Sequence, residues 1–142
     1  MKRFGLAGLL RVRDLEEQRA AAELAAANRA VDAVRTRGAR TRASLAGVRS
    51  DAVDAATLSS VIAARTSAQV LLGELSALHE LASRDAVEAR SAHGAARASA
   101  VSLEKLSRRH TESEAARELR EEQSALDEVA IQGWRESRKD GS

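Results

Sequence analysis

The sequence predicts an all-α protein: a long antiparallel two-helix coiled-coil hairpin with a C-terminal helix overhang. Its 142 residues include no Pro, where average usage of about 5% would give about seven. Hydrophobic residues make up 44% of the chain, yet many are Ala and only Phe4 and Trp134 are aromatic. Strands favour β-branched and aromatic residues, and a globular core needs large side chains. Long, thinly packed helices in a single coiled-coil domain over residues 1–142 suit this composition.

The first helix is expected over residues 3–50. Its candidate seam positions recur in alternating steps of three and four residues, the spacing that keeps one helix face against a partner. These positions are Leu24, Ala27, Val31, Val34, Gly38, Thr41, Leu45, Val48 and Ala52.

A tight reversal is expected over about residues 51–57. The segment SDAVDAATLSS, residues 50–60, contains side chains that cap the start of a helix well. The candidate caps are Ser50, Asp51, Asp54 and Thr57.

The second helix is expected over residues 58–138, with a second seven-residue repeat. Its candidate seam positions are Val61, Ala64, Ala68, Leu71, Leu75, Leu78, Ala82, Asp85, Ala89, Ala92, Ala96, Ser99, Leu103 and Leu106. With a reversal near residue 54, the start of the first helix would lie beside about residue 106 of the second, and the second helix would continue unpaired beyond that point. At 1.5 Å per residue the paired part would span about 75 Å and the overhang about 45 Å.

Charge is distributed unevenly along the chain, although the formal net charge is only +2. Residues 34–73 include six arginines but only two aspartates, so the turn end is basic. These arginines are Arg35, Arg37, Arg40, Arg42, Arg49 and Arg65. Residues 112–128 include seven acidic residues but only two arginines, so the overhang is acidic. Such runs are often only solvated faces, but opposite charges at the two ends favour two different partners.

The residues give no pattern typical of an enzyme, a cofactor site or a metal site. There is no Cys, no Gly-rich phosphate loop and no metal-binding histidine motif. His79, His93 and His110 are expected to be surface side chains. The N-terminal MKRFGLAGLL is short for a signal peptide, and no apolar run approaches the roughly 20 residues of a membrane span. We therefore expect a soluble intracellular protein, with a nucleoid-associated DNA-binding coiled coil as an alternative function.

Three segments resemble the FliJ family of the flagellar type III export apparatus. FGLAGLLRVRDLEEQRAAAELAAA is similar to the family's opening, in which Phe and a Leu-rich turn precede a basic pair and a Glu-containing Ala-rich helix. SLEKLSRRH and EEQSALDEVA resemble its tail, with LE-x-L and EQ-x-x-x-DE patterns. The resemblance implies a cytoplasmic two-helix coiled coil, similar to the γ stalk of rotary ATPases. It would lie at the cytoplasmic face of the inner membrane, held there through its partners.

The resemblance also implies the partners. In this family the terminal end of the coiled coil engages the hexameric export ATPase, FliI, and another surface contacts the export gate protein FlhA. These contacts help couple ATP hydrolysis and proton motive force to export, and the family also escorts export substrates or chaperones. Carried over, the ATPase-binding residues would be Leu119, Glu122, Gln123, Leu126, Asp127, Glu128 and Trp134. The gate-binding residues would be Arg37, Arg40, Arg42, Leu71, Leu75 and Leu78. The family's mid-coil aromatic residues are missing, because these three leucines stand in their place. The stalk proteins of virulence injectisomes are the alternative within the same class.

Overall fold

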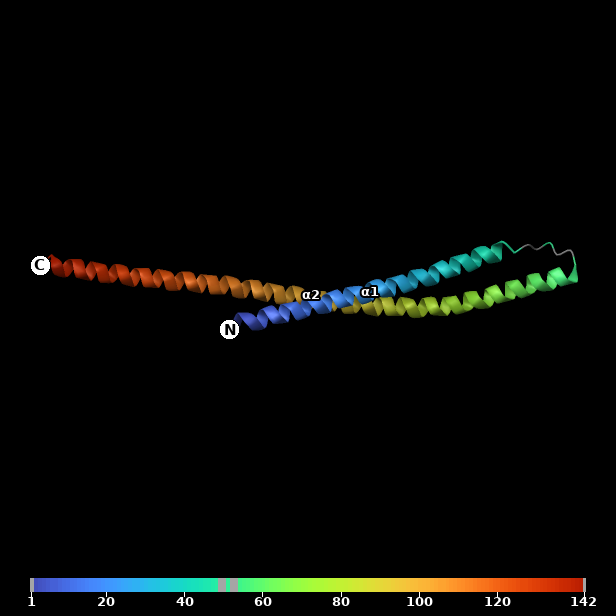
Figure 1. Cartoon of the computed structure of the whole chain (residues 1–142), viewed down its shortest axis with the longest axis horizontal. Helices are drawn as coiled ribbons and strands as arrows, with labels where there is room; N and C mark the ends of the chain where they lie inside the picture. Colours follow the sequence, from blue (N-terminus) through green and yellow to red (C-terminus); the bar gives the residue numbers. More distant parts are fainter. Residues whose placement is uncertain (1, 49–50, 52–53, 142) are drawn as a thin grey trace. The chain divides into compact units, whose positions relative to one another are not determined.

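The computed structural model contains two long helices and no strand in the part of the chain it describes, residues 2–48, 51 and 54–141. Helix α1 spans Lys2–Ala46 and helix α2 spans Ala55–Asp140 (Figure 1). They have 45 and 86 residues. The two helices pack against each other, which confirms the predicted all-α hairpin.

Both helix boundaries at the connection lie a few residues earlier in the sequence than predicted. Helix α1 ends at Ala46 rather than near residue 50, because Gly47 weakens helix propensity and Val48 N–H closes the last turn on the Leu45 carbonyl at 3.2 Å. Helix α2 begins at Ala55 rather than near residue 58. Asp54, one of the four proposed caps, caps the start of α2, since its Oδ1 accepts a hydrogen bond from Thr57 N–H at 2.7 Å. Ser50, Arg49 and Ala52 lie outside the described residues.

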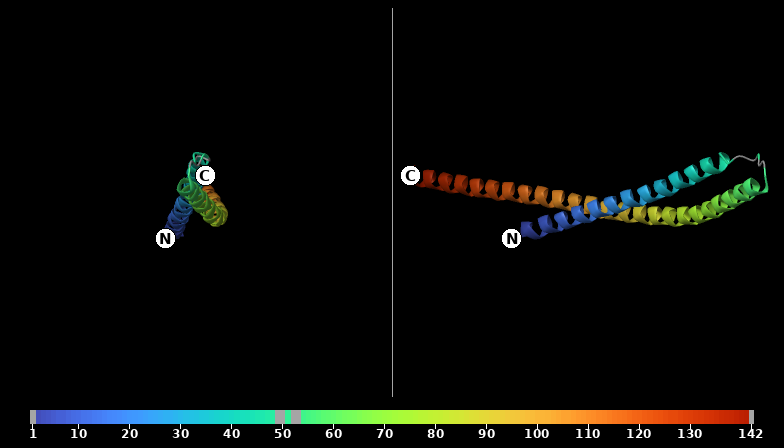
Figure 2. Two further views of the ribbon diagram at one scale, coloured as in Figure 1. Left: turned by 90° about the vertical axis from the view of Figure 1, so that its right-hand side faces the viewer. Right: turned by 45° about the vertical axis from the view of Figure 1, so that its right-hand side comes forward.

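Contacts divide the chain into two compact units, Arg11–Ala98 and Met1–Leu10 with Ser99–Ser142. Within residues 11–98, α1 and α2 run antiparallel and side by side (Figures 1 and 2). The α1 side of this hairpin follows the predicted repeat, extended toward the N-terminus by Arg13, Glu17 and Ala20. Between residues 11 and 48 the less exposed positions are Arg13, Glu17, Ala20, Ala21, Leu24, Ala27, Val31, Val34, Gly38, Thr41, Leu45 and Val48.

The α2 side of the hairpin corrects half of the predicted seam. Leu75, Ala82, Ala89 and Ala96 face α1 as expected, but the positions between them lie four residues on rather than three. These intervening positions are His79, Ala86 and His93, instead of Leu78, Asp85 and Ala92. Placing Ala86 inward leaves the Asp85 carboxylate in water, which avoids the cost of burying an unpaired charge.

The seam is thin. Among the described residues only Leu75, 3% exposed, and Ala86, 7% exposed, are buried apolar side chains. Most facing positions carry Ala, Gly, Ser or Val, which bring the helices together without burying much apolar area. The hairpin therefore depends on many small contacts along its length.

In the unit formed by residues 1–10 and 99–142, the start of α1 lies against α2. Leu6 and Leu10 line a shallow groove with Ser107, His110 and Glu114. Beyond Glu114 every described residue, from 115 to 141, is exposed. The overhang thus begins about two turns later than residue 107, the predicted start, because α1 pairs further along α2 than a symmetric reversal would give.

Candidate partner-binding surfaces

The last described part of the chain, residues 115–141, carries large apolar side chains that no other described part covers. Leu119 is 62% exposed, Leu126 is 68% exposed and Trp134 is 62% exposed. Val129 and Ile131 are also exposed. We call these five residues the C-terminal apolar surface. Single exposed leucines are ordinary, but Leu119, Leu126, Val129 and Trp134 lie within about 140° of one another around the helix, as apolar anchors do on a helix that binds in a groove.

Most of the C-terminal apolar surface does not continue the hairpin seam. The seam positions Leu103, Ser107, His110 and Glu114 recur in steps of four and three, and the same repeat would next reach the charged Arg117 and Glu121. Leu119 lies two residues after Arg117, which places it about 200° around the helix. Leu126 lies one heptad further and shares that face. A partner binding these leucines would therefore approach from a different side than α1 does.

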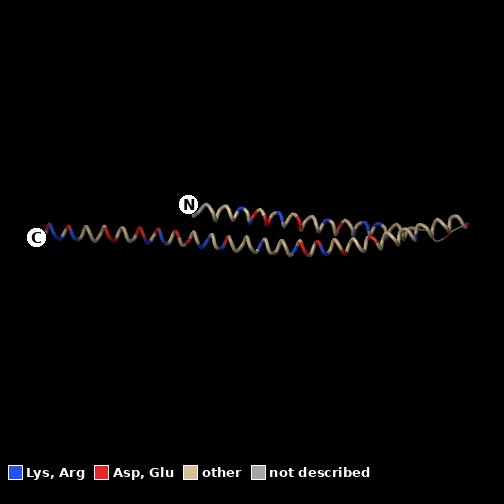
Figure 3. Tube along the Cα trace, turned by 90° about the horizontal axis from the view of Figure 1, so that it is seen from below, with Lys and Arg blue, Asp and Glu red and all other residues tan. Residues whose placement is uncertain are grey.

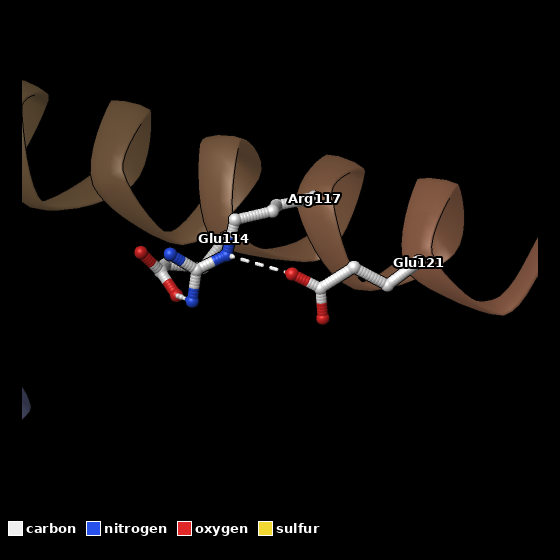
Figure 4. Close-up of polar contacts among 3 residues, drawn as sticks. All are labelled: Glu114, Arg117 and Glu121. Carbon is white, nitrogen blue, oxygen red and sulfur yellow. Dashed lines mark hydrogen bonds and ion pairs between the residues drawn. The ribbon is translucent and has the colours of Figure 1, made fainter. Parts of the chain in front are cut away.

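Ion pairs within α2 favour the helix in its acidic segment. The Arg117 guanidinium lies 2.9 Å from the Glu114 carboxylate and 3.6 Å from that of Glu121, so one cation bridges two turns (Figure 4). The second pair has the i,i+4 spacing at which opposite charges stabilise a helix. These pairs offset the repulsion between Glu118 and its neighbours Glu114 and Glu122, which are like charges at the same spacing.

The remaining acidic residues of this segment are open to solvent. Glu122, Asp127 and Glu128 are exposed and form no ion pair among the described residues, and Gln123 is exposed beside them. Red and blue segments alternate along this part of α2 in Figure 3. The predicted ATPase-binding residues are thus all exposed on one helix segment, although they do not share one face.

Trp134 is the one large aromatic side chain of the C-terminal apolar surface. The Arg138 guanidinium lies 4.6 Å from the centre of its ring, a cation–π contact. Arg138 and Lys139 also lie in the last turn of α2, where positive charge interacts favourably with the helix dipole. The contact holds the ring against its own helix and leaves most of the ring accessible.

The basic side chains lie near the connected end of the hairpin. Arg35, Arg37, Arg40 and Arg42 are exposed on α1, and none of them forms an ion pair in the part of the chain that the structure describes. We call these four residues the basic surface. Unpaired exposed charges of one sign create a field that attracts an oppositely charged surface.

The predicted gate-binding leucines differ in accessibility. Leu75 is buried in the seam, Leu71 is half-buried and Leu78 is 46% exposed. Of this set, only Arg42 and Leu75 line a common recess. The structure therefore leaves the arginines and Leu78 available to a partner, while Leu75 serves the packing of the two helices.

The three histidines lie in the seam, which corrects their prediction as surface side chains. His79 and His110 each line a recess between the helices, and His93 Nε2 lies 3.1 Å from Glu17 Oε1 across the hairpin. Both partners of this contact are half-buried. The sequence does contain a signal for this, because His79 and His93 are two heptads apart and therefore share one helix face. The predicted repeat stepped three residues from Leu75 and so assigned Leu78, not His79, to the seam.

In the described residues, no group of three or more His, Asp or Glu side chains is placed to hold a metal ion. Neither helix, over its described length, contains a stretch long and apolar enough to cross a membrane.

Comparison with models of protein families, with curated proteins and with solved structures gives no match.

Proposed function

We propose that this protein is a stalk-like component of the flagellar type III export apparatus, at the cytoplasmic face of the inner membrane. The observation that carries the proposal is the C-terminal apolar surface, which lies on a helix segment with no intrachain partner among the described residues. The resemblance of the chain's opening and tail to the FliJ family supplies the identity of the partners. The C-terminal apolar surface binds the hexameric export ATPase, and the basic surface meets the export gate.

The proposed mechanism uses the two surfaces of one hairpin. Trp134 and Leu126 are the anchor side chains in the ATPase complex, because aromatic and large aliphatic residues dominate the energy of protein interfaces. The exposed acids between them set orientation and association rate rather than affinity. The basic surface steers the hairpin to an acidic surface of the gate, so that one molecule contacts both and helps couple ATP hydrolysis to export.

The experiment compares stimulation of the purified export ATPase by the full chain, by a chain lacking residues 115–142, and by Leu126→Ala/Trp134→Ala. We expect the truncation to abolish stimulation while circular dichroism shows that the hairpin remains helical. The double substitution should weaken binding by about 1 kcal/mol or more. Leu15→Ala is the matched control, because Leu15 is 64% exposed on α1 and should bind like the unsubstituted chain.

Full stimulation by the truncated chain would show that residues 115–142 are only a solvated tail. If the chain instead stimulates an injectisome ATPase and not the flagellar one, the stalk mechanism holds in the related secretion system.

The gate contact has a separate test. Reversing Arg37, Arg40 and Arg42 to Glu should slow association with the gate's cytoplasmic domain and weaken the salt dependence of the rate, because exposed charges act mainly on encounter. The measurement is stopped-flow association at several salt concentrations. An unchanged rate in a helical variant would remove the basic surface from the mechanism.

A further inference from the structure

A recess opens between the two helices of the hairpin beside the basic surface. It has a volume of about 220 Å³, and its walls include Arg35, Gly38 and Arg42 from α1 and Leu75, Ser76 and His79 from α2. All of these residues belong to the unit of residues 11–98. The function proposed above uses Arg35 and Arg42 only as exposed charges of the basic surface and gives no role to the space between the helices.

Gly38 creates the recess. It occupies a buried seam position of α1, where every other residue of the repeat has a side chain to place against α2. A Cβ at this position would meet only the Arg42 guanidinium, at 3.8 Å. The gap is therefore bounded on one side by a cation and at its floor by Leu75, which is 3% exposed.

Hydrogen-bond donors dominate the polar part of the recess. The Arg35 and Arg42 guanidinium groups form no ion pair among the described residues, and no carboxylate lines the recess. Asp32 lies nearly one turn before Arg35 and lines a neighbouring groove, without forming an ion pair to it. Ser76 contributes a hydroxyl group, and His79 a ring that can donate from one nitrogen.

We propose that this recess binds a phosphate group. Two guanidinium groups, a hydroxyl group and an imidazole provide more donors than the two oxygens of a carboxylate can accept. A phosphate monoester has three terminal oxygens and a charge of about −1.5 to −2 at neutral pH, and arginine binds such groups through paired hydrogen bonds. The inference rests on the recess alone and stands whether or not the chain acts in protein export.

The test follows the Arg Nε–Hε signals of the full-length ¹⁵N-labelled protein by NMR during titration with sodium phosphate, with sodium chloride holding ionic strength constant. We expect saturable shifts at Arg35 and Arg42. Arg19 and Arg117 should not respond, because Arg19 pairs with Glu23 at 3.2 Å and Arg117 with Glu114 at 2.9 Å. Sodium acetate should give much smaller shifts, and equal shifts with acetate would overturn the assignment to phosphate.

Two variants and one matched control separate the recess from a general basic surface. Arg42→Gln should weaken phosphate binding at least fivefold. Arg37→Gln removes the same charge from the same helix but lies outside the recess, and should change binding less than twofold. Gly38→Leu keeps every charge and fills the gap, and should abolish the saturable shift while the chain remains helical, since Leu has the higher helix propensity.

Repeating the titration with O-phosphoserine distinguishes the source of the group. Tighter binding of phosphoserine would assign the recess to a phosphate carried on a larger molecule, and tighter binding of inorganic phosphate would assign it to the free ion. Equal weakening by Arg42→Gln and Arg37→Gln, or shifts that rise without saturation at all arginines, would show ion screening over a solvated surface and would refute the site.

Discussion

At the scale of single residues, the structure depends on a few polar contacts that hold the helices in place. Asp54 caps the start of α2, and its carbonyl accepts the first backbone hydrogen bond from Leu58 N–H at 3.1 Å. Hydrogen bonding by the Thr57 side chain, and then by the Thr57 backbone N–H, lowers the pKa of Asp54 from its ordinary value. Both bonds favour the ionised carboxylate, so the cap is strongest when Asp54 is charged.

We expect the Asp54 cap to be lost in acid. Because the pKa is lower in the folded state, the carboxylate contributes stability above its unfolded pKa of about 3.9, and this contribution disappears as the pH falls through the folded value. Asp54→Ala should lower the melting temperature at pH 7 and leave it unchanged at a pH below both pKa values. Melting curves followed by circular dichroism measure this. An equal loss at both pH values would assign the effect to helix propensity rather than to the carboxylate.

Glu17 and His93 form a polar link across the hairpin, with 3.1 Å between Oε1 and Nε2. Both side chains are partly shielded from water, so their hydrogen bond should contribute to stability by about 0.5 to 1.5 kcal/mol. A double-mutant cycle with Glu17→Ala and His93→Ala, read from urea unfolding, isolates this coupling. Glu23→Ala in place of Glu17→Ala is the control, because Glu23 pairs within α1. Additive effects of Glu17→Ala and His93→Ala would show that the two side chains do not interact in solution.

At the scale of the elements, α2 has two parts with different roles. Up to Glu114 its less exposed face lies against α1, and beyond Glu114 all described residues are exposed. The apolar residues change face at the same point, since Leu119 and Leu126 lie about 200° from the continued seam. One helix thus packs in the hairpin with one face and, beyond Glu114, leaves large apolar side chains exposed on another.

Because of this division, we expect two leucines of α2 to differ in how much they contribute to the stability of the hairpin. Leu75→Ala should destabilise the hairpin by about 2 kcal/mol, at the low end for buried leucines because the thin seam can partly close. Leu126→Ala should change stability by less than about 0.5 kcal/mol, as is usual at exposed positions. Urea unfolding of both variants provides the measurement. A comparable loss for Leu126→Ala would mean that residues 115–141 pack against a surface of the protein itself.

At the scale of the whole molecule, stability is unevenly spread along the chain. The described residues bury only two apolar side chains, so the free energy of unfolding should lie near the low end of the usual range, at about 5 kcal/mol. Residues 115–141 lack even this packing and retain only backbone hydrogen bonds and ion pairs along one helix. Backbone hydrogen bonds and ion pairs within one helix add little stability to an isolated helix in water.

Hydrogen exchange should report this gradient directly. We expect amides of residues 115–141 to exchange much faster than those of residues 68–96, because local unfolding of the unpaired helix does not disrupt the seam. Mass spectrometry of peptic fragments resolves the two regions. Adding the export ATPase should slow exchange in residues 115–141 if the proposed complex forms. Equal protection of both regions in the free protein would contradict the described exposure.

The sequence by itself determined the helices and the face that α1 presents, and it limited the cap of α2 to four candidates. The absence of Pro and the abundance of Ala leave few alternatives to helix. Along α1 the larger Leu and Val side chains mark one face clearly, so the positions from Leu24 to Val48 follow from their spacing. The hydrophobic and charged residues of the C-terminal surface were also recognisable, because they lie beyond the predicted pairing.

Only the tertiary structure decided which face of α2 meets α1, and how far along α2 the pairing extends. Ala occupies so many positions of α2 that steps of three or four residues after Leu75 were nearly equivalent in apolar area. The choice depends on where α1 lies, which brings His79 and His93 into the seam and leaves Leu78 outside. The recess at Gly38 has the same origin: its walls come from two helices, and a missing side chain becomes a cavity only when a second surface closes over it.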